Sequence, residues 1–246
     1  MSEHGGKAAS MDLISHLTEL RSRMLVIVVS LIVAFAITYT YSKVLYDILA
    51  MPLLAALPPE HEYLAFTGVV EPFYTYLKAA LVSAVVLACP VILYEIWAFA
   101  APGLYKNEKK WFFPVVFFSI LLFLTGVLFA HRVVFPVGFK YLLSFAGSEL
   151  RPVLSMGGYF SFATKLLVAF GAVFELPLFV LVLSVLGVVS GPGMLRAWKY
   201  ALLVSVVVGA VLTPPDVFSQ LLMAGPIMLL YSVSIIIAYV FGKKKK

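Results

Sequence analysis

VAFGAVFELPLF, residues 168–179, places one carboxylate inside a stretch that otherwise reads as part of a membrane span. The carboxylate is Glu175, and Pro177 follows it by two positions. A carboxyl group near the middle of a span is costly unless it is paired, protonated or hydrated. Pro177 has no backbone N–H to donate to the carbonyl of Val173, so we expect a kink there. The stretch predicts a membrane helix that contains a polar site.

The composition of the whole chain supports a membrane protein. Of the 246 residues, 63% are hydrophobic and 12% are charged, and the mean hydropathy is +1.04. A soluble domain is about half apolar and about one quarter charged, so lipid is the expected solvent. The net charge of +6 does not indicate a nucleic-acid partner, because the basic residues gather at the ends of apolar runs. A single cysteine, Cys89, excludes an intrachain disulfide.

Six apolar runs are candidate membrane spans, each of which needs roughly 20 residues. They are Met24–Tyr41, Tyr76–Trp97, Phe112–Ala130, Tyr159–Val185, Trp198–Leu212 and Val217–Phe241. The fifth is short, since its helix would rise only about 22 Å, and Gly225-Pro226 interrupts the sixth. We predict an all-α integral membrane protein, with one polytopic domain over residues 1–246 and two short final helices.

The distribution of basic residues predicts the orientation. With six spans, 12 of the 18 lysines and arginines fall on one face. These are Lys7, Arg21, Arg23, Lys106, Lys109, Lys110, Arg196, Lys199 and Lys243 to Lys246. The positive-inside rule makes this face cytoplasmic, with both termini and the basic tail 242–246 on it. Three tryptophans are predicted at the same interface as belt aromatics: Trp97, Trp111 and Trp198.

Several shorter segments have predicted structural roles. VLYDILAMPLLAAL (44–57) and FPVGFKYLLSFAG (135–147) are expected to form interfacial helices that cap the outer side. An amphipathic helix over about 10–23 is expected to run into the first span, because apolar residues recur there at helical spacing. Gly126 and Gly171 are predicted to allow close helix packing.

Three acidic residues outside the span centres have simple structural interpretations. Glu19 and Arg23 lie four residues apart, which suits an ordinary solvated ion pair. Glu108, within a basic run, is explained by pairing with neighbouring lysines. Asp216 follows two prolines and is predicted to cap the last helix.

Glu175 favours a function, although a hydrogen bond that only locks two helices remains the alternative. We expect its polar partners from the short spans, namely Thr213, Ser219 and Gln220. From the residues alone, two functions stay open. One is a binding and assembly protein, and the other is a proton- or ion-coupled secondary transporter that uses Glu175.

The motifs of common enzymes are missing from the sequence. It contains no HExxH, no Walker A motif and no glycine-rich dinucleotide turn, and its four histidines are scattered outside the span centres. We therefore predict no metal, no cofactor and no enzymatic activity.

The ordered motifs of the chain resemble the TatC family, the receptor subunit of the twin-arginine protein translocase. The motifs are HLTELRSR (16–23), EPF (71–73), PVILYEIWAFAAPGLYKNEKK (90–110), FGAVFELPL (170–178) and LTPPDVFSQ (212–220). They run over nearly the whole chain, with six spans in the expected places. One departure is Ser232, at a position where many family members carry a glutamate.

The resemblance implies roles for individual residues. It implies that signal-peptide binding involves Glu19, Glu108, Leu20, Arg21 and Phe99. It implies that Glu175 is the intramembrane glutamate, with Thr213 and Gln220 in a polar group that docks partner subunits. Independently of the resemblance, the sequence between the fifth and sixth spans predicts a tight outer turn at Pro214, Pro215 and Asp216.

The resemblance also implies partners and a location. The partners would be folded precursor proteins with paired arginines in their signal peptides, and single-span subunits of the TatA and TatB type. The family draws on the proton-motive force. We expect a multi-pass protein of a bacterial or archaeal cytoplasmic membrane that forms a homo-oligomer in the assembled translocase.

Overall fold

Helices make up almost all of the computed structural model, which describes residues 3–57, 64–66, 68–100, 109–146, 154–213 and 216–242. The elements are α1 (Glu3–Thr40), α2 (Ser42–Leu54), α3 (Glu71–Ala100), α4 (Lys109–Phe129), the π-helix η3 (Ala130–Val134), α5 (Phe135–Leu143), the 3₁₀ helix η4 (Ser144–Ala146), α6 (Met156–Phe174), α7 (Leu176–Val185), α8 (Gly191–Arg196), α9 (Trp198–Leu212) and α10 (Val217–Phe241). Within the described ranges, the β-structure consists of one isolated bridge between Ala65 and Ser155.

The expected set of spans is confirmed. Five stretches are long and apolar enough to cross a membrane: His16–Thr40, Glu71–Ala100, Phe112–Leu143, Met156–Val185 and Val217–Phe241. The shorter apolar helix α9 provides the sixth, with 15 residues. The prediction of a short last helix is wrong, because α10 runs for 25 residues through Pro226. A proline removes one backbone hydrogen bond, and a packed membrane helix tolerates that loss.

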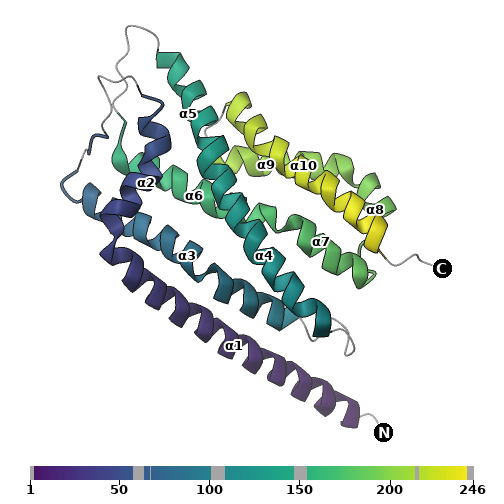
Figure 1. Cartoon of the computed structure of the whole chain (residues 1–246). Coiled ribbons are helices and arrows are strands. Elements are labelled where there is room, and N and C mark those ends of the chain that lie inside the picture. The colour runs from purple at the N-terminus through teal and green to yellow at the C-terminus, as the bar shows by residue number, and fades with distance from the viewer. Residues whose placement is uncertain are drawn as a thin grey trace.

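The helices form a bundle with two distinct ends (Figure 1). The start of α1, the end of α10 and the short helix α8 lie at one end, which we call the terminal end. Helix α2 and the end of α5 lie at the other, which we call the opposite end. The helix predicted at 44–57 is present as α2, at the opposite end of the bundle, and its place on the outer side of the membrane stays a prediction. The cap expected at 135–147 is instead a continuation of α4, because η3 carries the helix onward into α5.

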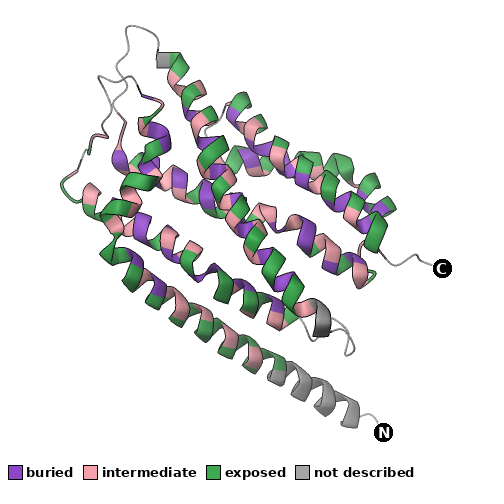
Figure 2. Ribbon diagram, viewed as in Figure 1, coloured by how far each residue is buried: buried purple, intermediate pink, exposed green. Residues whose placement is uncertain are grey.

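Helix α6 lies at the centre of the bundle, and α1 lies at its edge. Helix α6 packs against α3, α4, α9 and α10, whereas α1 packs mainly along α3. Only 6% of the residues in the most apolar stretch of α1 are buried, and Figure 2 shows many exposed residues along this helix. The largest buried side chains around α6 are aromatic: Phe135, Phe160 and Phe170.

Side-chain hydrogen bonds fix several helix ends. Asp216 accepts a 2.8 Å hydrogen bond from the backbone of Ser219, which confirms the predicted cap of α10. At the opposite end, one oxygen of Glu71 accepts from the Ser155 hydroxyl at 2.6 Å and from the Gly157 backbone at 2.7 Å. Glu71 belongs to the EPF motif, and these bonds join the start of α3 to the start of α6.

The predicted close packing at two glycines is confirmed where α4 crosses α6. A Cβ on Gly126 would lie 2.5 Å from the carbonyl oxygen of Phe170. A Cβ on Gly171 would lie 2.6 Å from the ring of Phe123. The absence of side chains at these two positions brings the helix backbones together.

Replacement of Gly126 by alanine is therefore expected to destabilise the bundle by about 1 kcal/mol or more, because the added methyl group meets a backbone atom rather than a mobile side chain. Thermal melting of the purified protein in detergent measures this change. The matched control is Gly225→Ala in α10, where an added Cβ meets nothing within 4 Å. Equal melting temperatures for the Gly126 variant and the control would contradict the close-packing argument.

Candidate functional site

Three charged side chains form a cluster between α1 and α3, which we call the arginine cluster. Arg23 donates from Nε and Nη2 to Oε1 of Glu19, at 3.0 and 2.7 Å. It also donates from Nη1 to Oε2 of Glu95 on α3, at 2.9 Å. The side chains of Glu19, Arg23 and Glu95 are 34%, 23% and 12% exposed. The pair expected within α1 is confirmed, and the structure adds a second acid to it.

An aromatic contact extends the same strip of the α1–α3 interface. The rings of His16 and Phe99 stack with their centroids 4.6 Å apart and their planes at 27°. His16 precedes Glu19 by three residues on α1, and Phe99 follows Glu95 by four on α3, so each pair shares a helix face. The structure thus brings the predicted site residues Glu19 and Phe99 into one strip.

Of the remaining residues of the predicted signal site, two are described by the structure and one is not. Leu20 is 39% exposed, and Arg21 is exposed on α1 beside Glu19. Glu108 lies outside the described residues, as do Pro214 and Pro215 of the outer turn. The expected neighbourhood of Glu19 and Glu108 therefore stays a prediction.

Glu175 lies inside the bundle, at the junction between α6 and α7. Its backbone N–H bonds to the carbonyl of Ala172 at 3.2 Å, a tight three-residue turn that ends α6. Helix α7 starts at Leu176, with Pro177 in its first turn, where a missing N–H costs little. The kink expected at the proline is present as a break between α6 and α7. The break leaves Glu175 only 3% exposed.

A chain of hydrogen bonds connects Glu175 to two other helices. The Ser119 hydroxyl on α4 donates to Oε2 of Glu175 at 2.6 Å. The indole Nε1 of Trp97 on α3 donates to the Ser119 oxygen at 2.9 Å. We call Trp97, Ser119 and Glu175 the buried carboxyl network. The second carboxyl oxygen, Oε1, is buried without a hydrogen-bond partner in the described part of the chain.

The buried carboxyl network corrects two predictions. Trp97 is 3% exposed and packs on Phe179, with ring centroids 5.1 Å apart, so it is not a belt aromatic at the membrane interface. From its position on α3, the indole of Trp97 points into the bundle, where the indole N–H donates to Ser119. The hydrogen bond to Glu175 comes from Ser119 on α4, not from the short spans as expected. Ser119 carries no sequence signal for this role, because it is 56 residues from Glu175.

Two of the polar residues that were expected to bond to Glu175 have partners at the contact between α9 and α10 instead. Thr213 donates to the carbonyl of Gly209 at 2.8 Å, and Gln220 donates to the carbonyl of Val206 at 3.0 Å. The bond from Gln220 joins α10 to α9, where Gly209 allows a close approach to Gln220. This geometry places Thr213 and Gln220 together at the α9–α10 crossing.

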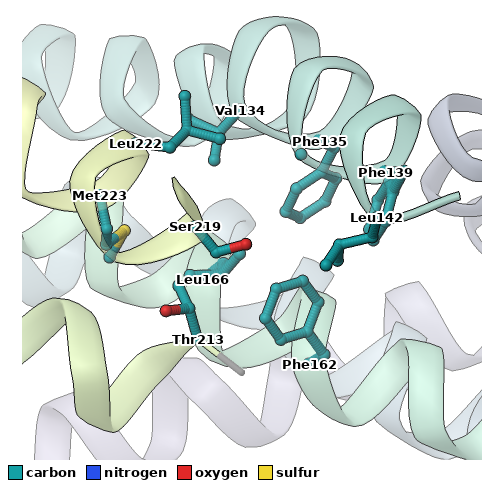
Figure 3. A pocket seen from close by; sticks show the side chains of 11 residues that line it. Val134, Phe135, Phe139, Leu142, Phe162, Leu166, Thr213, Ser219, Leu222 and Met223 are labelled. Atoms are coloured by element: carbon teal, nitrogen blue, oxygen red, sulfur yellow. The ribbon is translucent and has the colours of Figure 1, made fainter. Parts of the chain in front are cut away.

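A small cavity of about 20 Å³ lies beside this crossing, between α5, α6 and the start of α10 (Figure 3). Thr213 and Ser219 supply hydroxyl groups to a lining that is otherwise apolar. Its volume is enough for about one water molecule, so it does not hold a substrate. Glu175 does not line this cavity.

The fold defines a class: a multi-pass helical membrane protein with a few polar side chains buried between its helices. The described residues contain no group of three metal-ligating side chains. The sequence model of the family described as Sec-independent protein translocase protein (TatC) matches residues 15–226. The chain belongs to the TatC family.

Individual relatives agree over almost the whole chain. TatC of Desulforapulum autotrophicum is 46% identical over 230 residues, which cover 94% of this chain and 85% of the relative. TatC of Carboxydothermus hydrogenoformans is 41% identical over 229 residues, which cover 93% of both chains. A crystal structure of the twin-arginine translocase receptor TatC superposes with a TM-score of 0.83 at 39% identity, covering 91% of this chain and 97% of the other. These matches support a translocase component and give no support to the transporter alternative.

Proposed function

We propose that this chain is the receptor of a twin-arginine translocase and binds the paired arginines of a signal peptide at the terminal end of the bundle. The observation that carries the proposal is the arginine cluster, in which Glu19 already holds a guanidinium group. The family's receptor role, given by a solved relative described as a translocase receptor, agrees with it. The function is binding and assembly, without a chemical step.

The chemistry of the cluster suits arginine better than lysine. A guanidinium group is a planar fork that donates several hydrogen bonds at fixed angles, whereas an ammonium group is a strongly hydrated point charge. Glu19 receives two donors of one guanidinium, and Glu95 receives a third. Glu108 is proposed as the acid for the second arginine of the signal.

We further propose that the terminal end faces the cytoplasm of a bacterial cell. Arg196 and Lys199 lie at this end, in α8 and at the start of α9, and α1 begins and α10 ends there. The positive-inside rule assigns such an end to the cytoplasm. Signal peptides reach the membrane from the cytoplasm, so this orientation presents Glu19 to them.

Site-specific photo-crosslinking in membrane vesicles tests both proposals. A photoreactive residue replaces Leu20, next to Glu19, and precursors are offered with two arginines or two lysines in the signal. We expect a strong adduct only with the paired-arginine precursor, and only in vesicles whose cytoplasmic face points outward. Equal adducts with both precursors would refute arginine recognition, and an adduct only in the opposite vesicle orientation would refute the topology.

A second proposed role is the docking of single-span partner subunits within the membrane, in an assembly that holds several copies of this chain. Its support is the buried Oε1 of Glu175, which has no hydrogen-bond partner in the described part of the chain and can accept from a partner helix once the helices that cover it move apart. Thr213 and Gln220 on the α9–α10 crossing are proposed as further contacts.

Glu175→Gln tests the docking role without loss of the internal bond. Ser119 then donates to the amide oxygen, so the amide NH₂ group takes the free position and offers a donor where the protein offers an acceptor. We expect recovery of co-purified partner subunit to fall about 5–10-fold, the value of one lost hydrogen bond of about 1 kcal/mol or slightly more. Unchanged recovery, with an unchanged melting temperature, would make Glu175 purely structural.

A further inference from the structure

The arginine cluster has an unbalanced charge. It holds two carboxylates, Glu19 and Glu95, and one guanidinium, Arg23. Two negative charges against one positive charge leave a net charge of −1, so the cluster still attracts a cation. Glu95 is the less exposed acid, and it lies on a different helix from the other two side chains.

The guanidinium group of Arg23 lies where it can move away from Glu19 and Glu95. Arg23 is 23% exposed, on a helix at the edge of the bundle that packs mainly along α3. A partly exposed ion pair contributes less net free energy than a buried one, because water screens it. Arg23 can therefore swing into solvent without opening the hydrophobic core.

When Arg23 moves away, Glu19 and Glu95 lose their hydrogen-bond donor. Two partly buried carboxylates on facing helices then lie close together, and each needs a new donor. A second guanidinium restores the contacts to both acids, and the ammonium of a lysine restores them less well. The two carboxylates are therefore arranged to bind an arginine side chain.

We propose that Glu95 is part of the signal-arginine site, and that Arg23 is an internal competitor which a signal arginine displaces from Glu19 and Glu95. This inference rests on the proposed receptor function. Such exchange weakens signal binding by the free energy with which Arg23 binds the two acids. It also speeds release of the peptide, because Arg23 binds Glu19 and Glu95 again. The bound peptide is thereby kept exchangeable, as a receptor that hands on its cargo requires.

The structural alternative is that Arg23 only fastens α1 to α3. The two roles predict opposite signs. If Arg23 competes, its removal tightens peptide binding. If Arg23 only fastens the helices, its removal loosens the Glu19 face from α3 and leaves binding weaker or unchanged.

The test measures dissociation constants of fluorescent signal peptides, with either two arginines or two lysines, for the full chain in lipid nanodiscs. The variants are Arg23→Gln, which removes the guanidinium, and Arg23→Lys, which keeps the charge but not the fork. The matched control is Lys199→Gln, which removes one positive charge from an exposed residue at the same end of the bundle. Melting temperatures show that each variant is folded.

We expect Arg23→Gln to bind the paired-arginine peptide about 5-fold more tightly, since a change of about 5-fold corresponds to the upper value for one solvent-exposed ion pair. Arg23→Lys is expected to bind it about 3-fold more tightly, although its charge is unchanged. Lys199→Gln is expected to change binding less than 2-fold, because distant charges are screened.

The possible failures are distinguishable. If the unaltered chain binds both peptides equally, the proposed receptor function fails. If it prefers paired arginines, but neither Arg23 variant binds more tightly than Lys199→Gln, only the competitor role fails. If Arg23→Gln does not fold, the Arg23→Lys result decides alone.

Discussion

Ser119→Ala is expected to destabilise the helix bundle by about 3 kcal/mol. The substitution removes one oxygen that serves two partners, because Ser119 accepts from Trp97 and donates to Glu175. Ser119 is fully buried, with 0% exposure, so water cannot replace the lost bonds. A buried polar group left without a partner costs about 1–3 kcal/mol, and this substitution leaves two such groups.

Thermal melting in detergent measures this loss, and a double variant identifies its source. Ser119→Ala with Glu175→Leu removes the stranded carboxyl group and is expected to recover about 1 kcal/mol or more of the loss. The matched control is Ser232→Ala, since Ser232 is exposed and its hydroxyl bonds to the carbonyl of Met228 in its own helix. A change below about 0.5 kcal/mol is expected for the control. If Ser119→Ala melts like the control, the network does not stabilise the bundle.

Glu19→Gln is expected to weaken binding of a paired-arginine signal peptide about 30-fold. Loss of one partner of a close charge pair costs about 2–5 kcal/mol, and the lower figure applies here because the Glu19 side chain is 34% exposed. About 2 kcal/mol corresponds to about 30-fold in the dissociation constant. Glutamine keeps the size of the side chain, so the measured loss reports on charge.

The measurement is peptide titration in nanodiscs, repeated at low and high salt. The matched control is Asp47→Asn, which removes one negative charge from an exposed residue on α2 at the opposite end. We expect the control to change binding less than 2-fold, and the effect of Glu19→Gln to shrink as salt is raised. Equal affinity of the Glu19 variant and the unaltered chain would remove Glu19 from the signal site.

Much of the fold was predictable because a membrane constrains it strongly. A span must be apolar, helical and about 20 residues long, so six runs of sequence identify six helices. Local signals were also reliable. Asp216 after two prolines predicted a cap, Pro177 predicted a kink, and the four-residue spacing of Glu19 and Arg23 predicted their ion pair.

Predictions that needed contacts between distant segments were the ones that failed or were missed. Trp97 was predicted at the interface because aromatic residues gather there, but its place on α3 turns it inward to Ser119. The partners of Glu175 were expected from the short spans, but they come from α4. Glu95 lies near the end of a span and was predicted to have no particular role, yet it completes the arginine cluster from 72 residues away.

The sequence by itself therefore determined the membrane class, the number of spans, the break at Glu175 and, through its motifs, the family. All of these follow from composition and from interactions within one helix, which depend on spacing along the chain. Only the tertiary structure decided which buried polar groups meet. The choice of Ser119 for Glu175 and of Glu95 for Arg23 depends on how each helix is rotated and crossed by its neighbours, and that geometry comes from the packing of all the helices together.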